Sequence, residues 1–171
     1  MRKIGLIHWI FFLAGLLGIL SLDLITKWLA VRGVIGETAI IRGVFYVTAY
    51  QKNTGTAFGL DLPIWVQIIG SAVILFLLVR LGLDYIFINQ KSSLFGFDSI
   101  LSNKKSSLFR LAILGAIVGG GLGNLLGRVL DGYVVDFIVL RPLPIFNVAD
   151  IGITVGIILL FGTIVLSSKK D

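Results

Sequence analysis

Four long apolar stretches dominate the pattern of hydrophobic and polar positions along the chain. They cover residues 5–22, 63–79, 111–126 and 151–166, approximately. A bilayer core of about 30 Å is crossed by roughly 20 apolar residues in a helix, so each stretch predicts a transmembrane helix with little tilt. The first follows two basic residues like a secretory signal, but no small-residue cleavage pattern comes after it, which favours a retained span. We therefore expect one integral membrane domain over residues 1–171.

The composition removes several classes of protein. Of the 171 residues, 57% are hydrophobic and 14% are charged, whereas soluble domains carry about 25% charged residues. A soluble globular chain and a disordered chain are therefore excluded. The chain has no cysteine and one histidine, His8. This excludes thiol chemistry and leaves too few ligands for a thiolate or multi-histidine metal site, so we expect no metal and no cofactor.

The distribution of basic residues predicts the orientation in the membrane. Four spans place both termini on one side, together with the connection from Arg80 to Arg110. Nine of the 15 lysines and arginines fall on that side, and basic residues are enriched on cytoplasmic faces. We therefore predict cytoplasmic termini, a cytoplasmic insertion over residues 81–110, and extracytoplasmic segments over residues 28–62 and 128–150. The net charge of +6 then indicates contact with membrane lipids and not with nucleic acid.

Most of the acidic residues lie on the extracytoplasmic side. The six are Asp23, Glu37, Asp61, Asp131, Asp136 and Asp150, out of nine acids in the chain. Acids do not set topology, so their position calls for another explanation. Residues 37–41 and 44–48 contain alternating, β-branched side chains, which predicts a small sheet on this side. The expected fold class is an all-α membrane protein with four transmembrane helices and a small extracytoplasmic β element.

Two polar clusters lie where the membrane makes polar groups costly. Asp23 and Lys27 are four residues apart, so on a helix they share a face and can pair. The pair either closes the first helix at the interface or supports a site. The second cluster, residues 53–59, has the asparagine and glycines of a tight turn that lets backbone approach a ligand. An ordinary hairpin turn has the same pattern and is the favoured alternative.

A third cluster begins with the glycine-rich residues 119–127. Gly120, Asn124 and Arg128 are spaced four apart, which places backbone, amide and guanidinium on one helical stripe facing one neighbour. Glycines in an apolar helix favour close helix packing. No strand precedes them, so a dinucleotide-binding loop is not expected.

Two acids complete this cluster. Asp136 lies inside the apolar run Val134–Ile138, and Asp150 directly precedes the fourth apolar stretch. Asp150 can act as a helix cap, whereas an acid among apolar residues is costly unless it is paired or solvated. The short connection between the two can fold back and bring both carboxyls together. Close acids in a low-dielectric site share one proton, which is how aspartic proteases activate water.

These blocks, taken in order, resemble the signal peptidase II family of lipoprotein signal peptidases. The blocks are Asp23-x-x-Thr26-Lys27, Asn53-x-Gly55-x-Ala57-Phe58-Gly59, Gly119-Gly120-x-x-Gly123-Asn124 with Arg128, Val135-Asp136-Phe137, and Phe146-Asn147-x-Ala149-Asp150. One block alone is unspecific, whereas five in this order on a four-span chain are highly specific. The chain departs from the family pattern at Gly127, where an acid is usual, and carries an acid at Asp131 instead.

The resemblance implies a bacterial intramembrane aspartic endopeptidase that cleaves a prolipoprotein before a cysteine carrying diacylglycerol. Asp136 and Asp150 fall at the positions of the catalytic pair. The family's supporting polar residues fall on Asp23, Lys27, Asn53, Asn124, Arg128 and Asn147. From the turn and the helical stripe, we also expect Gly55 and Gly120 to support the site or bind substrate. The implied location is the bacterial cell membrane, which is the inner membrane where there are two, with the site near the extracytoplasmic face. We expect a monomer.

A small proton-coupled transporter is the alternative that the acids alone allow, because transporters also place acids in a membrane. Such proteins usually show repeated halves or helices broken in mid-span. Here the acids lie at the ends of spans, and the spans show no clear internal repeat. The pattern therefore favours the peptidase.

Overall fold

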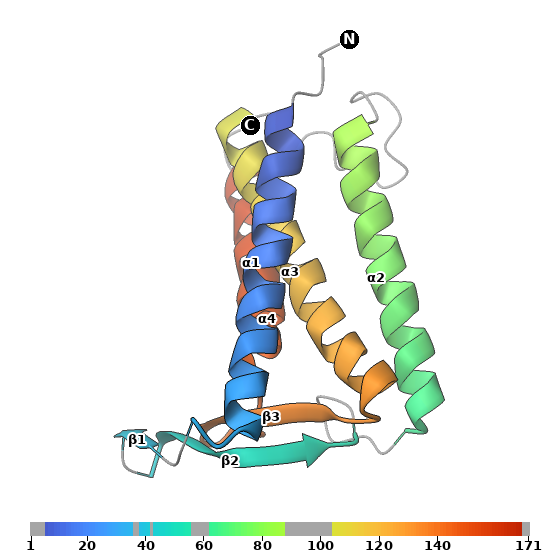
Figure 1. Cartoon of the computed structure of the whole chain (residues 1–171). Coiled ribbons are helices and arrows are strands. Elements are labelled where there is room, and N and C mark those ends of the chain that lie inside the picture. The colour runs from blue at the N-terminus through green and yellow to red at the C-terminus, as the bar shows by residue number, and fades with distance from the viewer. Residues whose placement is uncertain (1–5, 36–37, 42, 56–61, 88–103, 169–171) are drawn as a thin grey trace.

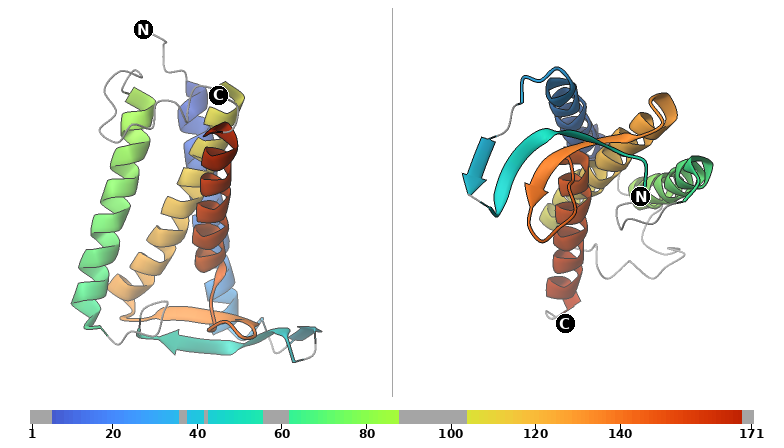
Figure 2. Two further views of the ribbon diagram at one scale, coloured as in Figure 1. Left: turned by 180° about the vertical axis from the view of Figure 1, so that it is seen from behind. Right: turned by 90° about the horizontal axis from the view of Figure 1, so that it is seen from below.

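The fold is mainly helical, with a small sheet at one end. The computed structural model describes residues 6–35, 38–41, 43–55, 62–87 and 104–168. Its elements are α1 (Leu6–Val31), β1 (Thr38–Ile41), β2 (Phe45–Asn53), α2 (Ile64–Phe87), α3 (Lys104–Leu130), β3 (Val134–Leu140) and α4 (Val148–Ser168). The helices lie along one another, and the sheet crosses one end of the bundle (Figures 1 and 2). The expected combination of helices and a small β element is confirmed.

Each expected apolar stretch coincides with a helix, apart from residues 5 and 63 at the starts of two of them, and each helix is longer than its stretch. α1 and residues 108–130 of α3 are long and apolar enough to cross a membrane, whereas the apolar parts of α2 and α4 are shorter. Residues 81–87 and 104–110 belong to α2 and α3, so the expected insertion is partly helical. The position of this insertion relative to the membrane stays a prediction, because hydropathy marks where a chain turns polar and not where its helix ends. Residues 88–103 lie outside the described residues.

The other three helices pack around α3. Gly15 of α1 and Gly115 of α3 leave no room for a Cβ, because the backbone of the opposite helix lies directly against each of them. Along the glycine-rich segment, Gly119 faces α1, Gly120 faces α4 and Gly121 faces α2. Small residues at these contacts let helix backbones approach closely. The packing interpretation of the glycine run is therefore confirmed.

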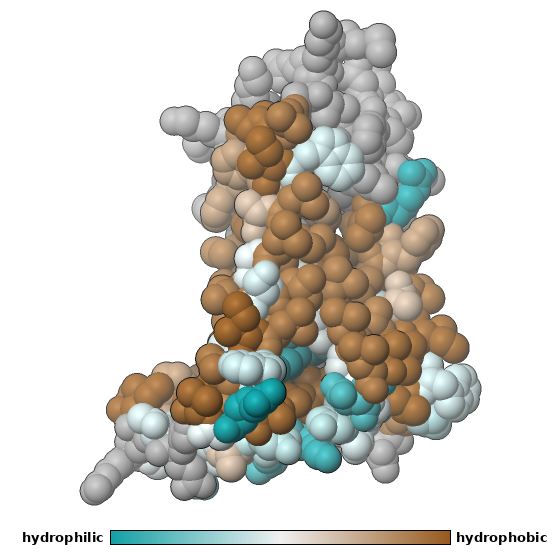
Figure 3. All heavy atoms as spheres, in the orientation of Figure 1, coloured by the Kyte–Doolittle hydropathy of each residue, from teal (hydrophilic) through white to brown (hydrophobic). Residues whose placement is uncertain are grey.

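Large apolar side chains cover the outside of the bundle. Leu6, Phe76, Ile158 and Phe161, on α1, α2 and α4, are each more than half exposed. The visible face of the helices is largely hydrophobic, and hydrophilic side chains gather toward the sheet (Figure 3). A continuous apolar surface of this extent is suited to lipid and not to water.

The sheet joins the connection between α1 and α2 to the connection between α3 and α4. Its order is β1-β2-β3, with both neighbouring pairs antiparallel. β1 and β2 form the expected two-stranded unit, whereas β3 was missed as a strand. The side chains from Val134 to Val139 are all buried, so the strand lacks the polar alternation that marks a half-exposed strand. Val135 and Phe137 pack with Ala30 at the end of α1, which fixes the sheet on the bundle.

Candidate active site

The chain reverses after β3 and returns to pair with it. The Phe146 N–H donates to the Ile138 carbonyl at 3.0 Å, and the Ile138 N–H donates back to the Phe146 carbonyl at 2.9 Å. This pairing places Asn147 and the first turn of α4 beside Asp136. The expected return of the connection between the two acids is confirmed.

Asn147 contacts both acids. Its side-chain Nδ2 donates to Asp136 Oδ1 at 2.6 Å, and its backbone N–H donates to Asp150 Oδ2 at 3.2 Å. The Asp150 N–H donates in turn to Asn147 Oδ1 at 3.0 Å. These last two bonds form a reciprocal cap at the start of α4. Asp150 therefore takes part in the cap of α4, which was one of the two interpretations of this acid. It also lies in the cluster with Asp136.

Two further asparagines donate to the remaining carboxylate oxygens. Asn53 Nδ2, at the end of β2, donates to Asp136 Oδ2 at 2.8 Å. Asn124 Nδ2, on α3, donates to Asp150 Oδ1 at 2.8 Å. Among the described residues, the direct partners of both acids are thus neutral amides, which orient the carboxyls without neutralising their charge. This favours a pair of acids that holds one proton between them.

The environment of Asp136 favours its protonated form. Its side chain is 2% exposed, and this burial raises the pKa of the Asp136 carboxyl from 3.8 to about 6. The hydrogen bond from Asn53 opposes the shift, and the nearby charge of Asp150 adds to it. A carboxyl with a pKa this close to neutral can hold and release a proton under physiological conditions.

Asp23 and Lys27 support the acid cluster from α1. Lys27 Nζ donates to Asp23 Oδ2 at 2.7 Å and to Asn124 Oδ1 at 2.9 Å. Asn147 Nδ2 donates to the same Asn124 oxygen at 3.1 Å. Because two donors hold Oδ1 of Asn124, its amide nitrogen must point toward Asp150. α1 continues to Val31, so the idea that the ion pair closes this helix is wrong.

Asp23 also binds the start of α4. Its Oδ1 accepts the Ala149 N–H at 2.9 Å, while a Cβ at Gly123 would overlap its other oxygen. Because Gly123 of α3 has no side chain, it leaves room for the Asp23 carboxylate of α1. One buried aspartate connects α1 to the helix that carries Asp150.

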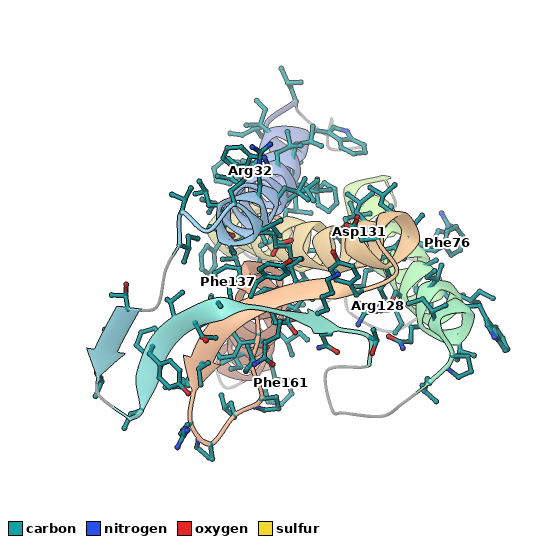
Figure 4. All side chains as sticks on the ribbon, turned by 60° about the horizontal axis from the view of Figure 1, so that its bottom comes forward. Arg32, Phe76, Arg128, Asp131, Phe137 and Phe161 are labelled. Carbon is teal, nitrogen blue, oxygen red and sulfur yellow. The ribbon has the colours of Figure 1, made fainter. Side chains whose placement is uncertain are left out.

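Gly120, Asn124 and Arg128 do not face one common neighbour, so that expectation was wrong. Gly120 lies against the Ala149 backbone of α4, whereas Arg128 is directed toward α2. Arg128 Nε donates to Gln67 Oε1 at 2.9 Å, and Arg128 Nη2 donates to the Gly55 carbonyl at 3.1 Å. Figure 4 shows Arg128 between α2 and the nearby ends of β2 and β3. The neighbours of α3 change along its length, which a stripe on a single helix does not reveal.

Gln67 is a site neighbour that the sequence interpretation missed. It is a polar residue within the apolar stretch at the start of α2, and this was the available signal. Gly127 lies against the backbone of Tyr133, with a Cβ placed 2.9 Å from the Tyr133 oxygen. A side chain at position 127 would therefore require the neighbouring backbone to shift. Arg128 is held by Gln67 and the Gly55 carbonyl, and not by an acid at position 127.

The segment beginning at Asn53 forms a turn after β2. The Gly55 N–H donates to Asn53 Oδ1 at 2.9 Å, which leaves Asn53 Nδ2 to reach Asp136. The favoured hairpin interpretation is wrong, because β2 is followed by α2 and not by a strand. Residues 56–59 of this block lie outside the described residues. Across the described part of the chain, no group of three or more His, Asp or Glu side chains is arranged to hold a metal ion.

Comparison with known proteins identifies the family. The family described as Signal peptidase (SPase) II matches residues 15–166. The chain belongs to the signal peptidase II family. The lipoprotein signal peptidase of Bacillus subtilis (strain 168) is 36% identical over 162 residues, which cover 89% of this chain and 91% of that protein. The lipoprotein signal peptidase of Brevibacillus brevis is 35% identical over 172 residues, which cover 95% of this chain and 99% of that protein.

Solved structures share the fold of this chain. The structure of a bacterial membrane enzyme at 2.3 Å resolution is similar, with a TM-score of 0.71 at 24% identity over 94% of this chain and 90% of that chain. A second bacterial membrane enzyme structure, at 1.9 Å resolution, has a TM-score of 0.65 at 25% identity. The match covers 88% of this chain and 89% of that chain. The resemblance seen in the sequence is confirmed, and the chain is a peptidase. None of these relatives supports the transporter alternative.

Proposed function

We propose that this chain is an intramembrane aspartic endopeptidase. It removes the signal peptide from diacylglyceryl-modified bacterial prolipoproteins and cuts before the lipid-modified cysteine. The observation that carries the proposal is the cluster of Asp136, Asn147 and Asp150, in which one asparagine contacts two carboxyls at the end of an apolar bundle. Membership of the signal peptidase II family supports the substrate class.

The chemistry follows from the two carboxyls. Asp136 holds the shared proton, because burial raises its pKa, and Asp150 takes a proton from the attacking water. The water oxygen bonds to the scissile carbonyl carbon, the C–N bond breaks, and the leaving amine receives a proton from the pair. Asn53 and Asn124 hold the two acids in place. Arg128 and Gly55 lie beside them and would position the peptide.

The arrangement of helices supports a four-span topology with cytoplasmic termini. The start of α1 and the end of α4 lie at the end of the bundle opposite the sheet (Figure 1). Trp28 and Trp65 are more than half exposed near the sheet end of α1 and α2, and such tryptophans are typical of a membrane interface. With cytoplasmic termini, as the basic residues predict, the acids would lie near the extracytoplasmic face of the cell membrane, which is the inner membrane where the host has two.

The substrate would reach this site from the lipid phase. The exposed apolar side chains of α1, α2 and α4 support a bundle surrounded by membrane lipids, and diacylglycerol is soluble in the same phase. The hydrogen-bond partners of the two acids described above all come from one chain, so a monomer can form the site.

The substrate class is tested by incubating the purified enzyme with a prolipoprotein in its diacylglyceryl-modified and unmodified forms. We expect the modified precursor to be cleaved and the unmodified precursor to be cleaved at least about a hundredfold more slowly, because binding energy from the acyl chains places the peptide at the acids. Product mass identifies the cleaved bond. Equal rates for the two precursors would contradict the proposed substrate.

The pH dependence of cleavage tests the proton on Asp136. Since the reaction requires this proton, kcat/KM should fall as the pH rises through about 6, by about tenfold for each further pH unit. Asn53→Ala removes a hydrogen bond that stabilises the carboxylate, so the pKa of Asp136 and the inflection should both rise. A profile of kcat/KM between pH 4.5 and 9 is the measurement. An inflection that moves downward in Asn53→Ala argues against Asp136 as the proton donor.

A further inference from the structure

Gln67 is a buried polar side chain of α2 that the proposed reaction does not use. It is 6% exposed and makes three side-chain hydrogen bonds. Its Oε1 accepts from Arg128 Nε at 2.9 Å, and its Nε2 donates to the carbonyls of Thr54 at 2.8 Å and Leu62 at 2.7 Å. A glutamine at the start of an apolar helix is costly unless its amide is satisfied. Here both ends of the amide are used.

These bonds begin a continuous chain of contacts that ends on a reacting acid. Arg128 Nη2 donates to the Gly55 carbonyl, and the Gly55 N–H donates to Asn53 Oδ1. Asn53 Nδ2 then donates to Asp136 Oδ2. The chain crosses from α2 through α3 and the turn after β2 to β3. A change at Gln67 can therefore reach Asp136 without a direct contact between them.

We infer that Gln67 is a positioning residue of the proteolytic site, holding Arg128 and the turn of Asn53 and Gly55 so that Asn53 meets Asp136. This inference rests on the proposed function. Without Gln67, the carbonyls of Thr54 and Leu62 lose a buried donor, and Arg128 loses the acceptor that fixes its direction. Arg128 also interacts electrostatically with Asp150 and, more weakly, with Asp136. A displaced guanidinium thus changes the field at both acids.

The test compares Gln67→Leu, Gln67→Glu and the control Ser71→Ala, one helical turn further along α2, by steady-state cleavage of a diacylglyceryl-modified prolipoprotein between pH 4.5 and 9. We expect Gln67→Leu to lower kcat about tenfold with a change in KM below about twofold, and to raise the alkaline inflection. Gln67→Glu keeps the acceptor for Arg128 but loses the donor to the Thr54 and Leu62 carbonyls, so it should restore only part of kcat. Ser71→Ala should match the unmodified enzyme.

A double variant separates positioning from general weakening of the fold. If Gln67 acts mainly through Asn53, then Gln67→Leu should raise the inflection less in an Asn53→Ala background than in the unmodified enzyme, because only the effect of the Arg128 charge is left. An independent, additive shift would overturn the inference, as would a Gln67→Leu variant with unchanged kcat and inflection. A folded Gln67→Leu that loses only thermal stability would also overturn it.

A substrate-free readout distinguishes this inference from the proposed function. The carboxyl of Asp136 can be titrated by ¹³C NMR of aspartate-labelled protein in detergent, with Asp136→Asn to assign its signal. Gln67→Leu should raise this midpoint even if no prolipoprotein is cleaved. Absence of cleavage by the unmodified enzyme would refute the proposed function, whereas an unchanged midpoint in Gln67→Leu would refute the role of Gln67.

Discussion

Asp136→Asn and Asp150→Asn are each expected to lower kcat for prolipoprotein cleavage by at least about a thousandfold, because an amide of the same shape neither holds nor accepts the required proton. Asp136 is buried and receives donors from Asn147 and Asn53. Two acids that share one proton act as a unit, so the double variant should be little worse than either single variant. Cleavage of a diacylglyceryl-modified precursor in detergent micelles measures the loss.

Asp131→Asn is the matched control for these variants. Asp131 is an exposed acid at the end of α3, on the same connection as Asp136 (Figure 4). We expect this variant to keep the kcat of the unmodified enzyme, since nothing in the proposed reaction depends on it. Thermal unfolding of each purified variant shows whether the bundle has formed. A folded Asp136→Asn enzyme that keeps more than about a tenth of the kcat of the unmodified enzyme would rule out catalysis by the two acids.

The helices could be predicted because lipid imposes a simple rule on the sequence. A segment that crosses hydrocarbon must be apolar and must satisfy its backbone hydrogen bonds internally, so long apolar stretches indicate helices. The boundaries were less accurate. α1 extends beyond its apolar stretch to include Asp23 and Lys27, whose charges are buried against α3 and α4 and are not exposed at an interface. Hydropathy reports the residue type and not its surroundings.

The acids of the site were also accessible from the sequence, for a different reason. Asp136 lies among apolar residues, where an acid without a partner is costly, and this cost drew attention to it. The strand that carries it was missed, because β3 is buried along both faces and shows no alternation. The hydrogen-bond partners of the two acids could not be predicted from the sequence either. Whether Asn124 points at Asp150 depends on Lys27 and Asn147, which reach it from other elements.

Asn147 illustrates how one residue can serve both the fold and the site. Its backbone and side-chain oxygen complete the cap of α4 with Asp150, and its side-chain nitrogen contacts Asp136 and Asn124. The helix cap therefore fixes the orientation of Asp150 relative to Asp136. In the proposed reaction, the geometry of the two acids would be set by the same hydrogen bonds that start the helix, so in the sequence Asp150 resembles an ordinary helix cap.

Lys27→Met should be the most destabilising single change in the supporting residues. Asp23 is fully buried, and its partner in the 2.7 Å ion pair is Lys27. Removing the lysine leaves a buried carboxylate with the Ala149 N–H as its remaining described donor. Breaking a buried pair in this way costs about 3–5 kcal/mol. Thermal or denaturant unfolding in detergent should show the loss, and cleavage should fall because Asn124 loses the donor that orients it.

The double variant Asp23→Asn/Lys27→Met separates these two effects. Asparagine removes the charge but keeps an oxygen that can accept the Ala149 N–H, so most of the lost stability should return. Activity should stay low, because Asn124 still lacks the bond from Lys27 that directs its amide toward Asp150. Recovery of both stability and activity would mean that Lys27 contributes only to the fold. Recovery of neither would show that the buried charge on Asp23 is not the cause of the loss.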